Sequence, residues 1–323
     1  MKALSRALLI SAVMMMMAGA PPALATDYLF TVINFPSDLH VATSGAYGIN
    51  ANHEIVGGFN NTSGQQWGYL RQTDGTIVPY QNTSADTYLF GLDDFGNMVG
   101  QYTSGSGMVA GFEQGNATNL NFGSMATAAW GINTSGQIVG YYLNAPDISF
   151  GYYLPSLGGT PTAIAYGNHF TLAMRINNNG QIVGYYLTND RSVHGFSVAC
   201  NDLSHPTDII HGNDNTFGWG INDSGAIVGG YIDGTGWHGY IYENGSFETI
   251  DFPGPGGVSY QTRIFGISDD GWLVGDYYDD GVYHAFLATP TDWATPVPVP
   301  ATLLLLGSGL LGLAGWRRRR PKS

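Results

Sequence analysis

The sequence predicts an all-β fold, a six-bladed β-propeller placed between two export signals. A ten-residue pattern of the type GINTSGQIVG recurs six times, beginning at positions 48, 91, 131, 175, 220 and 266. Self-similarity with a period of about 44 residues is typical of repeat architectures. Each copy reads as a β-hairpin, because a strand ending in Ile is followed by a turn rich in Asn, Asp and Gly and then by an Ile-Val-Gly strand.

Each unit contains two further predicted strands. HGYI at 238–241 is a third strand, and FETIDF at 247–252 is a fourth strand after a tight turn. Only five fourth strands occur for six units. The segment LFTVINFP at 29–36 resembles FETIDFP at 247–253, so we expect the N-terminal strand to complete the last blade. This exchange favours a closed propeller over an open β-solenoid, because closure removes unpaired strand edges.

The first 25 residues have the composition of a secretory signal peptide. Lys2 and Arg6 precede an apolar run, and Ala23 and Ala25 supply the small residues that signal peptidase accepts. We expect cleavage after Ala25. A retained membrane anchor is the alternative, but it needs about 20 apolar residues, and a Pro-Pro pair interrupts this segment.

The charge is distributed unevenly along the chain. All 24 acidic residues lie between Asp27 and Asp292, whereas seven of the eleven basic residues lie in the two terminal segments. The body between them keeps four arginines and no lysine, a formal net charge of −20. Nucleic acid is therefore excluded as a partner, since phosphate binding requires a basic surface. Cys200 is the single cysteine, so no intrachain disulfide supports the fold.

The repeated hairpin followed by His-Gly-Phe resembles the extracellular HAF repeat family. The resemblance covers most of residues 28–290, and the His-Gly-Phe signature is strongest at His194, His238 and His284. It implies a propeller-like fold and no defined biochemical activity. The three histidines occupy equivalent places in successive units, which spreads them around the ring. Structural hydrogen bonds to neighbouring blades are therefore expected instead of a shared metal site.

The C-terminal residues combine a short Pro-Val-Pro motif, an apolar stretch and a basic stop. Residues 301–316 are 16 apolar or small residues, about 24 Å as a helix, and the following arginines should remain cytoplasmic. An ordinary membrane anchor is one interpretation of such a tail. The residues that carry the pattern are Pro298, Pro300, Ala301, Arg317, Arg318, Arg319 and Arg320.

This tail resembles the PEP-CTERM sorting signal of Gram-negative bacteria, although Val299 stands where that motif usually has Glu. The resemblance implies cleavage by an exosortase and an association with exopolysaccharide. We therefore expect export across the inner membrane, with signal peptidase and exosortase as processing partners, and a cell-surface or extracellular location after the tail is removed. The expected segments are a signal peptide (1–25), a propeller (26–290), a Pro-rich linker (291–300), a transmembrane helix (301–316) and a basic tail (317–323).

An aromatic residue precedes the Gly-Ile of the repeat in five of the six units, and Met174 takes this place in the other. One interpretation is a ring around the propeller axis that stacks on sugars. The other is packing between blades, which the burial of inner strands favours. The five aromatic residues are Tyr47, Phe90, Trp130, Trp219 and Phe265.

Asp276, Asp279 and Asp280 have the oxygen-rich composition of a calcium loop, but they lack the EF-hand spacing. Turn formation is the interpretation that we favour for these residues. No cofactor is expected, and calcium is the only candidate. The segments 142–150 and 252–265 read as long, varied loops on one face, where binding usually occurs.

No catalytic residues are assigned, because neither Gly-x-Ser-x-Gly nor His-Glu-x-x-His occurs in the sequence. We expect a noncatalytic surface or matrix protein that binds a glycan or another surface protein. The alternative is a secreted polysaccharide hydrolase, which rests on analogy with other propellers and on the many carboxylates. A scaffold without any ligand is the third possibility.

Overall fold

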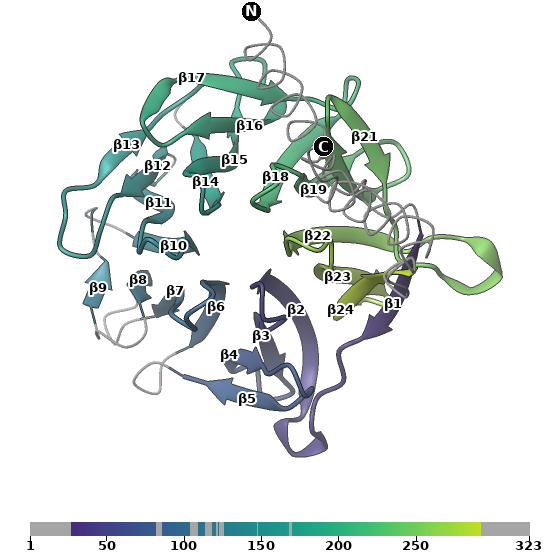
Figure 1. Cartoon of the computed structure of the whole chain (residues 1–323). Helices are drawn as coiled ribbons and strands as arrows, with labels where there is room; N and C mark the ends of the chain where they lie inside the picture. The colour runs from purple at the N-terminus through teal and green to yellow at the C-terminus, as the bar shows by residue number, and fades with distance from the viewer. Residues whose placement is uncertain are drawn as a thin grey trace, which may run out of the picture.

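Figure 1 shows a computed structural model in which β-sheets are arranged in a ring around a central axis. The structure describes residues 27–81, 86–103, 109–113, 118–120, 122, 126–146, 148–167 and 170–291. Within these ranges the only helical elements are two short 3-10 turns, η1 (Ser37–Leu39) and η2 (Pro255–Gly257). None of these residues forms a helix that is long and apolar enough to span a membrane.

Five blades are antiparallel sheets of four consecutive strands, with the first strand of each next to the axis. The first blade contains β2 (Val41–Ile49), β3 (Ile55–Asn61), β4 (Gln66–Arg71) and β5 (Ile77–Tyr80). The second contains β6 (Thr87–Leu92), β7 (Met98–Thr103), β8 (Val109–Glu113) and β9 (Thr118–Leu120). The third contains β10 (Ala126–Ile132), β11 (Ile138–Ala145), β12 (Ile148–Leu154) and β13 (Thr162–Ile164). The fourth contains β14 (Thr171–Ile176), β15 (Gln181–Leu187), β16 (Val193–Ala199) and β17 (Asp202–Ile209). The fifth contains β18 (Asn215–Ile221), β19 (Ile227–Ile232), β20 (Trp237–Glu243) and β21 (Ser246–Thr249).

The remaining four-stranded sheet, here called the closing sheet, is a composite of both ends of the described chain. It consists of β22 (Gln261–Ile267), β23 (Leu273–Asp279), β24 (Val282–Pro290) and β1 (Tyr28–Val32). The predicted count of six blades is therefore corrected to five self-contained blades plus this composite sheet. The sixth repeat has no fourth strand of its own, and β1 pairs antiparallel with β24 in its place.

Apolar packing and hydrogen bonds hold the two ends together. The ring of Phe30 lies 5.2 Å from that of Phe252 and 5.5 Å from that of Phe286. At the edge of the sheet, the backbone N–H of Thr291 donates to the carbonyl of Asp27 at 3.0 Å. The N-terminal edge of the propeller and the point where the C-terminal tail leaves it are thus adjacent.

The repeated turns form because their residues satisfy their own backbone groups. In the third blade, the Asn133 side-chain carbonyl accepts the N–H groups of Ser135 and Gln137, both at 3.1 Å. Gly136 takes the left-handed conformation with φ of 73°, which costs glycine little. His53 occupies the equivalent place in the first blade with φ of 59°.

Every first strand contains a β-bulge at the same place, one residue before the Gly-Ile of the repeat, or before Arg-Ile in the fourth blade. A bulge leaves one residue out of the ladder and redirects its side chain. Here the redirected residues are the predicted ring: Tyr47, Phe90, Trp130, Met174, Trp219 and Phe265.

Two loop predictions are wrong in part. Residues 142–150 do not form a long loop, because β11 continues to Ala145 and β12 begins at Ile148. Residues 252–265 are irregular only as far as Tyr260, after which β22 begins. In both segments the alternating apolar residues have partners on a neighbouring strand, so strand pairing overrides the turn-rich composition. The predicted signal peptide, sorting motif and transmembrane segment lie outside the described residues.

Candidate functional site

The predicted aromatic ring residues meet around the propeller axis. Phe90 and Trp130 are stacked, with ring centroids 3.8 Å apart. Tyr47 contacts Phe265 at 5.3 Å, and Trp219 contacts Phe265 at 4.7 Å. All five therefore belong to one aromatic cluster that the bulges aim inward.

Three of the five ring residues are buried and two are partly exposed, and stacking on sugars stays a prediction. Phe90, Trp219 and Phe265 are only 5–7% exposed, so they serve mainly as packing between blades. Tyr47 and Trp130 are partly exposed. Burial raises the pKa of the Tyr47 hydroxyl well above its usual value, which keeps that group neutral.

A cavity of about 360 Å³ opens over the ring at one end of the axis. Its volume lies in the range of small-molecule sites, and its lining is mostly aromatic with one charged side chain, as in such sites. The lining residues are Tyr47, Trp130, Met174, Tyr185, Phe217, Trp219, Trp237, Arg263 and Phe265.

The cavity is displaced towards the fifth blade, where Gly230 leaves space beside the axis. A β-carbon at this position would lie 2.7 Å from the Trp219 ring and 3.2 Å from the Trp237 ring. The residue after Ile-Val-Gly is larger in the third and fourth blades, where it is Tyr141 and Tyr185. Gly230 therefore makes room for the two tryptophans to lie side by side, with centroids 5.5 Å apart.

Arg263 is the charged residue of the cavity, and Asp276 holds it in place. Its Nε and Nη2 donate to the two carboxylate oxygens at 2.8 and 2.7 Å, and the guanidinium lies 4.1 Å from the centroid of the Tyr283 ring. Burial disfavours the charged guanidinium, but Asp276 raises the pKa of Arg263 above its ordinary value. This pairing leaves Nη1 as a donor outside the ion pair.

Arg175 separates this cavity from the other end of the axis. Its Nη1 donates to the carbonyls of Trp130 at 3.1 Å and Phe90 at 3.2 Å, and its Nη2 donates to that of Tyr47 at 2.5 Å. These carbonyls belong to the bulge residues of three blades. Burial lowers the pKa of Arg175 to about 10, which still leaves it charged at neutral pH.

The opposite end of the axis is ringed by the Asn and Asp side chains of the repeated turns around a space of only about 70 Å³. The amide of Asn133 donates to the carbonyl of Asn177 at 3.0 Å, and that of Asn177 donates to the carbonyl of Asn222 at 2.9 Å. The amide of Asn222 donates in the same way to the carbonyl of Ser268 at 3.2 Å. These contacts link each blade to the next, so this end is structural.

The three calcium candidates do not converge. Asp276 is 2% exposed and pairs with Arg263 as described above. Asp279 ends β23, and Asp280 and Gly281 form the following turn with φ of 44° and 90°. Among the residues that the structure describes, no group of three or more His, Cys, Asp or Glu side chains is placed to hold a metal ion.

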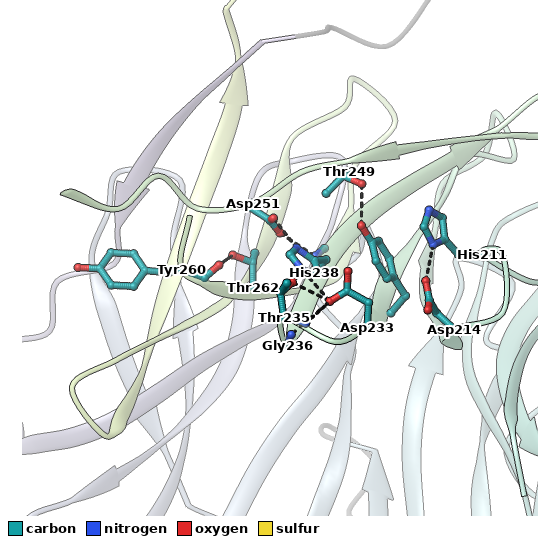
Figure 2. Close-up of polar contacts among 12 residues, drawn as sticks. His211, Asp214, Asp233, Thr235, Gly236, His238, Thr249, Asp251, Tyr260 and Thr262 are labelled. Carbon is teal, nitrogen blue, oxygen red and sulfur yellow. Dashed lines mark hydrogen bonds and ion pairs between the residues drawn. The ribbon is translucent and has the colours of Figure 1, made fainter. Parts of the chain in front are cut away.

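The contacts printed for two of the repeated histidines, His194 and His238, lie within their own blades, which corrects the expected contacts between blades for these two. Figure 2 shows His238 between Asp251 and the turn of Asp233 and Thr235. Its Nδ1 lies 2.7 Å from Asp251 and its Nε2 lies 2.7 Å from the Thr235 hydroxyl. His194 lies near Asp208 in the same way, but its Nδ1 is 3.8 Å from the carboxylate, which is too far for a hydrogen bond. The shared feature is an Asp near the end of the fourth strand, Asp208 within β17 and Asp251 two residues after β21. His284 packs against the Tyr277 ring.

Thr235, His238 and Asp251 are hydrogen-bonded in series, as the nucleophile, base and acid of a catalytic triad are. The contacts around Thr235 are nevertheless those of a structural turn. Asp233 accepts both the hydroxyl and the backbone N–H of Thr235 at 2.7 Å, and the N–H of Gly236 at 3.3 Å. The Thr235 side chain and its backbone N–H lower the pKa of Asp233 to about 2. The local N–H donors that an oxyanion would need are therefore already used.

Four cavity residues were not predicted from the sequence: Tyr185, Phe217, Trp237 and Arg263. A positional signal was available for two of them. Phe217 and Arg263 stand two residues before a ring residue, on the same face of the first strand. Trp237 stands next to His238, where the repeat shows no consistent residue type, so only the folded arrangement reveals its place.

Residues 296–320 match the PEP-CTERM protein-sorting motif. The motif indicates an exported protein that exosortase processes, and it implies a membrane-anchored C-terminal sorting signal of the kind found in Gram-negative bacteria. It includes the predicted residues from Pro298 to Arg320. The match does not reach the repeats, so their resemblance to HAF repeats stays a prediction. No curated protein shows significant sequence similarity to the chain.

Among solved structures, the chain is similar to the Aleuria aurantia lectin in complex with Fucalpha1-6GlcNAc. The TM-score is 0.51 with 14% identity, over 80% of this chain and 99% of the lectin. A luciferin-regenerating enzyme matches with a TM-score of 0.48 and 11% identity, over 82% of this chain and 96% of the enzyme. At these identities the lectin shows the propeller fold alone.

Proposed function

We propose that this chain is a noncatalytic, exported propeller that binds a glycan in its axial cavity, at the cell surface or in the extracellular matrix. The observation that carries the proposal is the cavity of about 360 Å³ lined by Trp130, Trp219, Trp237 and Arg263. The sorting motif supports the location, because it indicates an exported chain. Exopolysaccharide is the glycan that we propose it meets there.

The lining suits a sugar chemically. The faces of a pyranose ring carry C–H groups that pack on indole rings, and its edge carries hydroxyls that need hydrogen-bond partners. Trp219 and Trp237 supply neighbouring indole rings, and Arg263 supplies a donor at their side. Fixed aromatic surfaces also lose little conformational entropy on binding.

The lining offers nothing for hydrolysis. A glycosidase needs two carboxyl groups on either side of the scissile bond. No Asp or Glu is among the described residues that line the cavity, and Asp276 stands behind Arg263 as its ion-pair partner. The geometry therefore favours binding over the hydrolase alternative.

Trp237→Ala tests the site, with Trp67→Ala as the matched control. Trp67 is also partly exposed, but it packs on Phe59 and is not part of the cavity lining. Purified exopolysaccharide from an exosortase-containing bacterium is titrated with both variants and with the parent chain. We expect Trp237→Ala to weaken binding by about tenfold or more, roughly 1.4 kcal/mol, and Trp67→Ala to leave it unchanged. Equal binding by all three chains rejects the axial site.

The location is tested at the tail. The parent chain should lose its arginine tail, seen by intact mass, and should reach the surface. A variant with Pro298 and Pro300 changed to Ala should remain full length in the inner membrane. If the parent also stays full length in the membrane, the surface role loses its support.

A further inference from the structure

The axial cavity is closed at its inner end. Arg175 spans the axis and binds the carbonyls of Tyr47, Phe90 and Trp130, which belong to three different blades. The rings of Phe90 and Trp130, two of the residues whose carbonyls Arg175 binds, stack on each other with centroids 3.8 Å apart. The guanidinium borders the small space on the far side, so it lies between the two ends of the axis.

A closed inner end restricts how a polymer can bind. A glycan cannot pass through the axis, so its internal units would have to bend sharply to enter and leave by one opening. The volume of about 360 Å³ is near the lower limit for small-molecule sites. The space therefore suits one end of a chain better than a folded internal segment.

The electrostatics of the cavity favour an uncharged ligand. Among the described residues, Arg263 is the only charged residue of the lining, and its bidentate pairing with Asp276 offsets its charge. The body of the protein carries a formal charge of −20. An acidic sugar would approach a negative surface and find Arg263 already paired, while Arg175 below the cavity donates to backbone carbonyls, which disfavours its binding.

We propose that the cavity binds the terminal unit of a neutral glycan, with the chain end inserted towards Arg175 and the remainder of the chain in solvent. The proposal rests on the proposed function and specifies its ligand. The partly exposed Trp237, which lies beside the largely buried Trp219, provides the stacking surface for that terminal ring, and Nη1 of Arg263, which is outside the ion pair, donates to one of its hydroxyls.

The test uses exopolysaccharide that binds the parent chain, before and after partial acid cleavage. Cleavage creates new chain ends without adding mass. End-on binding predicts that the fragments compete with intact polymer more strongly per unit mass, in proportion to the number of ends. A carboxyl-reduced sample of the same polymer should compete as well as the untreated one, and added salt should leave the affinity unchanged.

Three results would separate the proposals. If the fragments compete less well per unit mass than intact polymer, internal segments are bound and the end-on proposal fails while the proposed function stands. If carboxyl reduction or added salt abolishes competition, the ligand is an acidic sugar and its proposed neutrality is wrong. If the polymer does not bind, or binds equally to Trp237→Ala, the proposed function itself fails.

Discussion

The two ends of the propeller axis are built from different parts of the repeat. At the turn end, Asn133, Asn177 and Asn222 occupy one repeated position and make the same contact with the next blade. At the cavity end, one position of the second strand holds Tyr185 in one blade and Gly230 in the next. The repeated residues assemble the ring, and the residues that differ between repeats shape the cavity.

This difference separates stability from binding. Changes at the turn end and at Arg175 should affect the free energy of unfolding, because they remove contacts between blades. Changes at Trp130, Trp237 and Arg263 should affect ligand binding more than folding, because these lining side chains are partly exposed. Substitutions at Arg175, Asn177, Gly230 and His53 should therefore have effects that decrease in this order.

Arg175→Met should give the largest loss of stability. It leaves the carbonyls of Tyr47, Phe90 and Trp130 without their charged donor, and each lost hydrogen bond to a charged group costs about 1.5–3 kcal/mol. We expect a total of roughly 3–5 kcal/mol by urea denaturation. Arg191→Met, at an exposed position, is the control and should change stability by less than about 0.5 kcal/mol. Equal effects would show that Arg175 is not a central link.

Asn177→Ala should lower the free energy of unfolding by about 2 kcal/mol. Asn177 is buried, and its side chain forms hydrogen bonds with the next blade and with its own turn. Asn178→Ala should cost less than about 1 kcal/mol. Asn178 bonds Asp223, but it is exposed to water that replaces the lost contacts. Thermal unfolding of the pair measures the difference, and a reversed order would contradict the assignment of the buried ring as the main link.

Gly230→Ala should affect the cavity end. The new methyl group meets Trp219 at 2.7 Å, so the indole must move into the cavity. We expect a loss of about 1 kcal/mol in stability and a clear loss of glycan binding. The matched change is Gly234→Ala, where nothing lies within 4 Å of the new methyl group. Unchanged binding in Gly230→Ala would show that the tryptophans are not the contact surface.

Substitutions of His53, which lies at the junction between the closing sheet and the first blade, should change stability least. It stacks on Trp272 at 3.8 Å and bonds Asp270 at 2.6 Å, but its φ of 59° is unfavourable for a side chain. His53→Gly removes the stacking contact but also relieves the unfavourable backbone conformation. Its free energy of unfolding should stay within about 1 kcal/mol of that of the parent. His53→Ala keeps the strain without the stack and should be about 1 kcal/mol less stable than His53→Gly. Equal stability of the two variants would contradict this account.

Periodicity predicted the strands, their hairpins and the strand that joins the two ends. It also located the ring, because Tyr47 and Trp130 recur at a fixed offset from the repeat. The predicted count of six blades is corrected to five that form from consecutive strands, while the sixth repeat is completed by β1, as its missing fourth strand indicated. The cavity was predictable only in part. Arg263 stands at a fixed offset from a ring residue, but Trp237 follows no repeat and meets Arg263 only when the fifth blade and the closing sheet pack around the axis.

The most direct test of the central claim is a crystal structure of the protein with a short neutral oligosaccharide cut from a polymer that it binds. The account predicts a terminal sugar ring against Trp219 and Trp237, with a hydroxyl near Arg263 and the rest of the chain pointing to solvent. A sugar bound at the junctions between blades, or at the ring of asparagines, would contradict it.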